Sequence, residues 1–160
     1  MEQRFDARIR TPFAVLGIRA PGATLNELVY LPRDTPPLAP RSSLAERLAR
    51  QVEHYLDDAG YRFDLPLLLE GSEFQRRVWR EIARIGPGKT RSYGEIAARL
   101  GSAPRPVGGA CGRNPVPLVV PCHRVLAASG GLGGFMGGKA DFPLSVKRWL
   151  LRHEGIPGVV

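Results

Sequence analysis

Short runs of apolar residues alternate with polar ones in the first part of the chain. Alternation over 5–9 predicts a half-buried strand, and 25–31 is a second strand candidate. A helix is expected to begin at Ser43, because Ser43 and Glu46 have the spacing of a capping box and apolar residues then recur with helical period. No catalytic group of residues stands out, so we expect residues 1–68 to form an α+β scaffold domain.

The capping-box spacing recurs twice in the second part of the chain. The pairs are Ser72 with Gln75 and Ser92 with Glu95. After the second pair, a helical pattern ends at Gly101, and a further segment with helical period follows at 107–114. Two short helices joined by a glycine-containing turn are typical of a helix-turn-helix. We therefore expect residues 69–160 to form a mostly helical domain with this motif.

The start of the second of these helices has two unusual features. Arg105 lies between two prolines, so we expect it to project from the helix entrance. Gly108 and Gly109 follow, and each costs a helix about 1 kcal/mol relative to alanine. Either another backbone, such as a DNA strand, approaches closely here, or the glycines allow tight packing within the protein itself.

The charge balance changes the functional picture. There are 23 Lys and Arg against 15 Asp and Glu, giving a net charge of +8 that is almost entirely due to arginine. This favours a polyanionic partner, with nucleic acid ahead of a membrane surface, although GC-rich coding DNA would also enrich arginine. We find neither a secretion signal nor a membrane-spanning run, so we expect a cytoplasmic protein, nucleoid-associated in a prokaryote or nuclear in a eukaryote.

Two cysteines, Cys111 and Cys122, provide the candidate chemistry. They form no C-x-x-C pair, and the histidines are too scattered for a zinc site, so one of them is a candidate working thiol. Residues 118–120 predict a buried strand that ends just before Cys122. His123 is a candidate base, and Glu154 is the candidate carboxylate that orients it. Taken alone, a cysteine on an apolar run is also compatible with a small buried core residue.

Several segments of the second part resemble the O6-alkylguanine-DNA alkyltransferases. The clearest is the Pro-Cys-His-Arg-Val motif that contains Cys122. The matching segments, in the order of the family, are 73–79, 91–97, 105–110, 114–115, 121–125, 147–151 and 153–155. The first part matches only loosely, and the family has a ribonuclease-H-like α+β domain there. The resemblance thus implies a small ribonuclease-H-like N-terminal domain before the helical one.

The resemblance implies a function and roles for individual residues. The protein would flip O6-alkylguanine out of duplex DNA and transfer the alkyl group irreversibly to Cys122, once per molecule. His123, acting through a water and held by Glu154, would deprotonate the thiol. Asn114 would brace the segment that carries it. Tyr93 would help to rotate the nucleotide and donate a hydrogen bond to the base. No cofactor or metal is implied.

The resemblance also implies a mode of DNA binding. The recognition helix would enter the minor groove, Arg105 would fill the space left by the flipped nucleotide, and the two glycines would let the DNA backbone pass closely. The residues assigned to DNA binding are Arg105, Tyr93, Gly108, Gly109, Ala110, Arg113 and Arg124. We expect a monomer, and leave open whether several molecules bind DNA side by side.

Some positions depart from the family pattern. Segment 137–144 is longer than usual, and Met136 stands where a small residue is often found. The first domain has no cysteine and a single histidine, His54, so the zinc site of some members is not expected. Two other classes stay open: a protein that binds the lesion without repairing it, and a cysteine hydrolase that uses Cys122 and His123. We expect Cys111 to be buried on the recognition helix.

Overall fold

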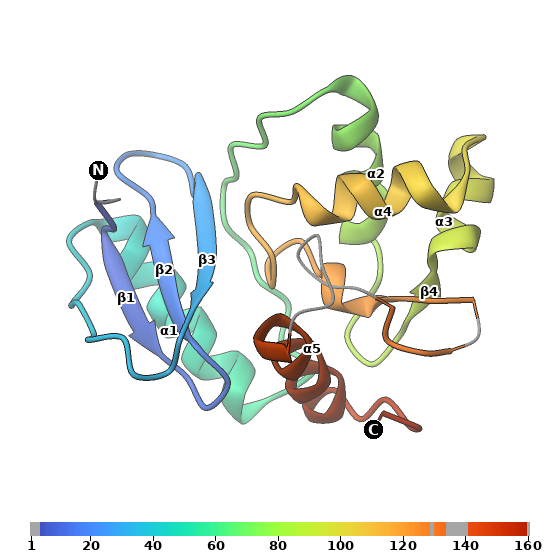
Figure 1. The fold of residues 1–160 in the computed structure, drawn as a ribbon. Coiled ribbons are helices and arrows are strands. Elements are labelled where there is room, and N and C mark those ends of the chain that lie inside the picture. The colour runs from blue at the N-terminus through green and yellow to red at the C-terminus, as the bar shows by residue number, and fades with distance from the viewer. Residues whose placement is uncertain (1–3, 129, 134–140, 160) are drawn as a thin grey trace. The chain divides into compact units, whose positions relative to one another are not determined.

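The structure is a computed structural model that describes residues 4–128, 130–133 and 141–159 (Figure 1). The chain divides into two compact units, Met1–Leu69 and Glu70–Val160. The described residues form a mixed α/β fold with small sheets and five α-helices. Among them, no helix combines the length and the hydropathy needed to cross a membrane.

The first unit is a three-stranded antiparallel sheet with one helix. Strands β1 (Ala7–Arg10), β2 (Val15–Arg19) and β3 (Glu27–Leu31) lie in the order β1-β2-β3, and α1 (Ser43–Asp57) follows (Figure 1). The two strands predicted from the sequence are present. The central strand β2 was not predicted, because four of its five residues are buried and it lacks the alternation of a half-buried strand.

The cap of α1 lies one residue before the predicted position. The N-cap is Ser42, whose side chain accepts a hydrogen bond from the backbone N–H of Ala45 and donates one to the carbonyl of Ala20. The prediction of a Ser43–Glu46 capping box was therefore wrong. The bond to Ala20 reaches across the unit, and no local pattern in the sequence reports it.

The second unit is mostly helical. Its helices are α2 (Glu73–Ala83), α3 (Tyr93–Leu100), α4 (Pro104–Gly112) and α5 (Asp141–His153). Both predicted capping boxes are present, at the starts of α2 and α3, and α3 ends at Gly101, which has a left-handed backbone. Helices α2, α3 and α4 pack against one another, and the indole N–H of Trp79 donates 2.9 Å to the carbonyl of Ala110 (Figure 1).

Two further segments of this unit position the candidate thiol. Strand β4 (Arg91–Ser92) pairs in parallel with β5 (Val125–Leu126), directly after the 3₁₀ turn η1 (Cys122–Arg124). The predicted strand over residues 118–120 is wrong. That segment is a turn in which Leu118 has a φ of 77° and Pro117 forms a single bridge to Val120. Leucine and valine favour a strand, but the Asn114 side chain bonds to the backbone of Val116 and Val120 and so stabilises a turn.

Candidate active site and nucleic-acid interface

Cys122 lies in the buried turn η1, with 2% of its surface exposed. Its neighbour in space is Asn114, just after the end of α4. The Asn114 Nδ2 group donates 2.9 Å to the Cys122 sulfur and 2.9 Å to the carbonyl of Val120. The Asn114 Oδ1 atom accepts from the backbone N–H of Val116 at 2.9 Å. Asn114 therefore connects to the turn that precedes the thiol and also touches the sulfur.

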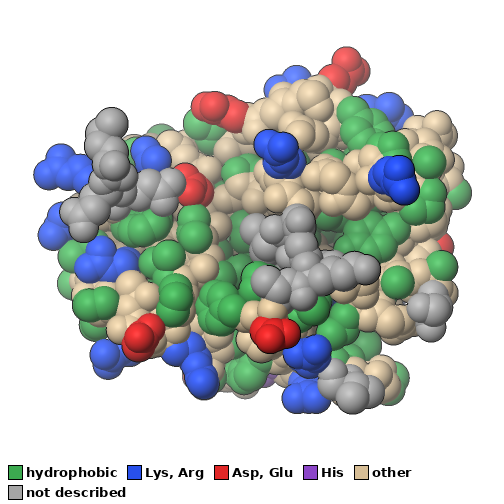
Figure 2. All heavy atoms as spheres, viewed as in Figure 1, with side chains coloured by type: hydrophobic (Ala, Val, Ile, Leu, Met, Phe, Trp, Pro, Cys, Tyr) green, Lys and Arg blue, Asp and Glu red, His purple; other side chains and the backbone are tan. Residues whose placement is uncertain are grey.

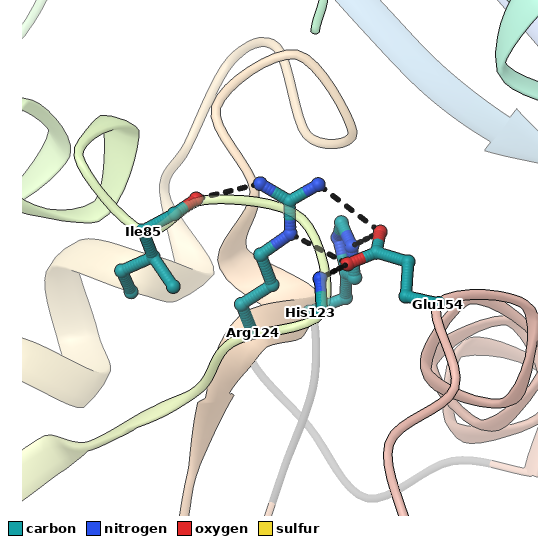
Figure 3. Close-up of polar contacts among 5 residues, drawn as sticks. Ile85, His123, Arg124 and Glu154 are labelled. Carbon is teal, nitrogen blue, oxygen red and sulfur yellow. Dashed lines mark hydrogen bonds and ion pairs between the residues drawn. The ribbon is translucent and has the colours of Figure 1, made fainter. Parts of the chain in front are cut away.

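His123 is fully buried and oriented by a carboxylate. Its Nε2 atom lies 2.7 Å from Glu154 Oε2 at the end of α5 (Figure 3). Because a carboxylate only accepts, Nε2 carries the hydrogen and Nδ1 keeps a lone pair. Nδ1 is buried and has no hydrogen-bond partner among the described residues. The structure thus brings His123 and Glu154 together as predicted, and it leaves one ring nitrogen able to accept a proton.

The ionisation of this pair follows from its surroundings. Burial lowers the pKa of His123 below its usual value, and the attraction of Glu154 does not fully offset that effect. Burial alone would raise the pKa of Glu154, but hydrogen bonds and charges from His123 and Arg124 outweigh it and hold that pKa well below its usual range. A neutral imidazole beside a charged carboxylate is the arrangement of a general base.

Arg124 belongs to the same network (Figure 3). Its Nε and Nη2 atoms donate to the two oxygens of Glu154 at 2.8 and 3.1 Å, and Nη1 donates to the carbonyl of Ile85 at 2.6 Å. The residue is 7% exposed. The sequence reasoning placed Arg124 on DNA, whereas its guanidinium is committed to partners inside the protein. Its ion-pair partner is thirty residues away in the chain, so no local signal indicates it.

A buried lysine that the sequence reasoning did not assign lies near the thiol. Lys147, on α5, donates to the carbonyls of Val125 and Leu132 at 2.7 and 2.6 Å. Its Nζ atom lies 5.9 Å from the centre of the Tyr93 ring. Burial lowers the pKa of Lys147 to about 8, and burial raises the pKa of Tyr93 above its usual value. Tyr93 therefore keeps its hydrogen at neutral pH and can donate it.

Except for Arg124, the residues expected to contact DNA lie on α3, on α4 or, as Arg113 does, directly after α4. Helix α4 begins at Pro104, so Arg105 lies in the first turn of α4. Arg105 is exposed. A Cβ atom added at Gly109 would meet no described atom within 4 Å, and one at Gly108 would only reach the Tyr93 ring at 4.0 Å. Packing within the described protein therefore does not explain these glycines. Arg113 is exposed, but Ala110 is 3% exposed and faces the core.

The two units differ in net charge. Residues 1–69 contain 9 Lys and Arg and 9 Asp and Glu, whereas residues 70–160 contain 14 and 6 and so carry the whole net charge of +8. On the face shown in Figure 2, the basic side chains are dispersed among uncharged ones and do not form one dense patch. The attraction to a polyanion therefore resides in the unit that holds the thiol.

Several expectations fall partly outside the description. Met136 and residues 137–140 of the longer segment are not among the described residues. From Asp141 onward, that segment belongs to α5. Cys111 is 5% exposed on α4, as expected. No group of three or more candidate ligands that could hold a metal is found within the described part of the chain.

The second unit combines a thiol hydrogen-bonded by Asn114, a buried histidine oriented by Glu154 and an excess of basic residues. These features suit a protein that transfers a group from nucleic acid to its own cysteine. Comparisons with known proteins point the same way. The family model described as 6-O-methylguanine DNA methyltransferase, DNA binding domain, matches residues 73–156. The chain belongs to this family.

Individual relatives agree with the family match. The methylated-DNA–protein-cysteine methyltransferase of Mycobacterium tuberculosis is 38% identical over 152 residues, which cover 91% of this chain and 89% of the relative. That of Methanosarcina acetivorans is 45% identical over 109 residues, 67% of each chain. The crystal structure of Mycobacterium tuberculosis OGT in complex with DNA has a TM-score of 0.76 at 38% identity, and the match covers 94% of both chains.

Proposed function

We propose that this protein repairs O6-alkylated guanine in duplex DNA by moving the alkyl group from O6 to the sulfur of Cys122. The carrying observation is the geometry around that thiol. Asn114 donates a hydrogen bond to the sulfur, and the adjacent His123 is held by Glu154 with Nδ1 left as a buried acceptor. Family membership supplies the reaction class.

The reaction follows from these groups. His123 Nδ1 accepts the thiol proton through a water, and the Asn114 amide stabilises the sulfur anion. The thiolate attacks the alkyl carbon, a C–S bond forms, and the C–O bond breaks with its electron pair passing to the guanine. Tyr93 offsets this charge by donating a hydrogen bond to the base. The product is a thioether that neither water nor His123 cleaves, so each molecule acts once and needs no cofactor.

Access to the base requires flipping, because stacking hides the O6 substituent inside the duplex. Extrusion costs a few kcal/mol, and less for a poorly paired alkylguanine. We assign α3 and α4 as a helix-turn-helix that enters the minor groove. The exposed Arg105 fills the vacated space, and Arg113 contacts the backbone. The open surface at Gly108 and Gly109 supports close passage of a DNA strand.

Two predicted contacts are revised in this proposal. Arg124 acts inside the protein, where it fixes the Glu154 carboxylate that orients His123. Ala110 contributes a small side chain to the core and its carbonyl to Trp79, so its role at the interface is to allow close approach.

We further propose a division of labour between two domains. Residues 1–68 form a ribonuclease-H-like scaffold, and residues 69–160 bind DNA and accept the alkyl group. The absence of net charge in the first unit supports this division, because that unit offers no net attraction to DNA. We propose that the protein acts as a monomer.

Intact-protein mass spectrometry after mixing with duplex DNA containing one O6-methylguanine tests the function. We expect a gain of one methyl group per molecule, located on Cys122 by peptide mapping. Cys122→Ala should lose transfer but keep binding to the lesion, while Cys111→Ala should keep both. Tight binding without a mass gain would make the protein a non-repairing lesion reader. Repeated turnover with release of a product would point to a hydrolase.

A further inference from the structure

The second thiol has no part in the proposed reaction, yet it lies beside the first. Cys111 and Cys122 are the two cysteines of the chain, both free and both buried. Cys111 lies in the last turn of α4 and Cys122 begins η1. The Cys122 Sγ atom lies 3.7 Å from the backbone carbonyl oxygen of Cys111, so the reactive sulfur is in contact with the residue that carries the second thiol.

Asn114 holds these two places together. Its backbone N–H donates 3.2 Å to the Cys111 carbonyl, and its side-chain Nδ2 donates 2.9 Å to the Cys122 sulfur. One residue therefore ties the end of α4 to the sulfur of η1. The backbone of Cys111 is thus held next to the Cys122 sulfur by the fold.

We propose that Cys111 and Cys122 form an oxidative modification site, in which a peroxide oxidises Cys122 and Cys111 traps the product as a disulfide. The proposal rests on the proposed function in one respect, because a pocket that admits an alkylated base to Cys122 also admits a small peroxide. It goes beyond that function by giving Cys111 a role that alkyl transfer does not need.

The chemistry balances with hydrogen peroxide as the oxidant. The Cys122 thiolate attacks one peroxide oxygen, the O–O bond breaks, and the sulfur becomes a sulfenic acid while the other oxygen leaves as water after taking up a proton. The Cys111 sulfur then attacks the Cys122 sulfur, an S–S bond forms, and the hydroxyl group leaves as water with the proton of the Cys111 thiol. Two electrons pass from the two sulfurs to the peroxide.

The surroundings of Cys111 explain why its thiol does not react before Cys122 is oxidised. Its pKa is raised above the usual value, chiefly by the hydrogen bond with Cys122 and then by burial. Cys111 is therefore a poor nucleophile in the resting protein and does not compete for alkyl groups. Once Cys122 is a sulfenic acid, its sulfur is electrophilic and can be attacked by the sulfur of Cys111.

The consequence is protection of a reagent that is used once. A sulfenic acid that meets no thiol is oxidised further to sulfinic and sulfonic acids, which ordinary thiols do not reduce. A disulfide stops this series and is reversed by a dithiol reductant. Oxidised molecules would thus be held as an inactive disulfide, and reduction would restore their activity. Molecules without Cys111 would instead be inactivated irreversibly.

The test uses the full chain and its Cys111→Ala variant. Each is treated with hydrogen peroxide, quenched, and measured by non-reducing intact mass spectrometry, peptide mapping and alkyl transfer before and after dithiothreitol. In the unmodified chain we expect a loss of two hydrogens, a cross-linked peptide joining Cys111 to Cys122, and transfer that dithiothreitol restores. In the variant we expect a gain of two or three oxygens on Cys122 and a loss of transfer that dithiothreitol does not reverse.

A second control is protein already methylated on Cys122, which should form no cross-link. The proposal is overturned if the unmodified chain gains oxygens as fast as Cys111→Ala and no cross-linked peptide forms. Circular dichroism checks that both proteins are folded before treatment. A cross-link in a protein that transfers no alkyl group would support the modification site and reject the proposed function, so the two failures are distinguishable.

Discussion

Replacing Glu154 by glutamine keeps the size of the side chain but removes the negative charge of the buried network. The carboxylate interacts with His123 Nε2, with Nε and Nη2 of Arg124, and with the backbone N–H of Gly88 at 3.3 Å. Arg124 would keep its charge with 7% of its surface exposed and no carboxylate beside it. Removing one partner of such a buried pair costs about 3–5 kcal/mol of unfolding free energy.

The same change affects the base. A carboxylate can only accept, so it holds the hydrogen of His123 on Nε2, whereas the glutamine amide can also donate and so favour the other tautomer. Nδ1 would then carry a hydrogen and could not take the thiol proton. Because a positioned general base contributes about 10²–10⁴-fold, we expect Glu154→Gln to slow alkyl transfer by a factor in that range.

Urea unfolding and single-turnover transfer to O6-methylguanine duplex measure the two effects separately. The matched control is Glu81→Gln, since Glu81 pairs with the exposed Arg84 and Arg99 side chains in the same unit. An exposed pair contributes about 0–1 kcal/mol, so the control should be nearly as stable as the unmodified protein and equally active. The reasoning fails if folded Glu154→Gln matches this control in both assays.

Three further predictions concern DNA binding and pH. Arg105→Ala should slow repair in duplex DNA but not reaction with a free O6-alkylguanine base. Arg80→Ala removes another exposed charge, from α2, and should leave both rates similar to those of the unmodified protein. Equal effects of the two substitutions would reject the finger role. Gly109→Ala should raise the free energy of unfolding by up to about 1 kcal/mol, which thermal unfolding would measure. The same substitution should weaken DNA binding, which fluorescence anisotropy would measure. Unchanged binding would contradict close passage of the DNA strand. The lowered pKa of buried His123 means that, below its usual value of 6.5, the unfolded chain binds a proton that the folded chain does not. Stability should therefore fall from about pH 7.5 to about pH 5.5, and by less in His123→Asn, as urea titrations at the two pH values would show.

Local patterns in the sequence predicted the features that depend on neighbouring residues. The starts of α2 and α3 are set by capping boxes whose two members are three residues apart, and both are present. At α1, the capping-box spacing pointed to Ser43 with Glu46, whereas the N-cap is Ser42, which has Ala45 three residues later. Ser42 also donates a hydrogen bond to the carbonyl of Ala20, and that bond exists only in the folded unit.

In the candidate site, too, the sequence predicted what depends on neighbouring residues and missed what depends on distant ones. Asn114, Cys122 and His123 lie within ten residues, in two segments that resemble family motifs, and the structure brings the Asn114 side chain to the Cys122 sulfur. Arg124 lies in that stretch too, but its environment depends on Ile85 and Glu154, which come from distant parts of the chain. Composition could not reveal whether its charge points to solvent or into the core.

The concentration of net charge in residues 70–160 has a consequence for how lesions are found. Attraction to DNA phosphates provides non-specific residence, and its salt dependence scales with the number of phosphates neutralised. Because the first unit has no net charge, it adds no net electrostatic attraction between the protein and the duplex. It only increases the mass and the friction of a molecule that moves along the DNA. Because the thiol reacts only once, what matters is how many base pairs one molecule contacts before Cys122 is alkylated. Ionic strength would weaken the attraction between the second unit and the DNA phosphates, and it would therefore set how long each molecule stays on the duplex.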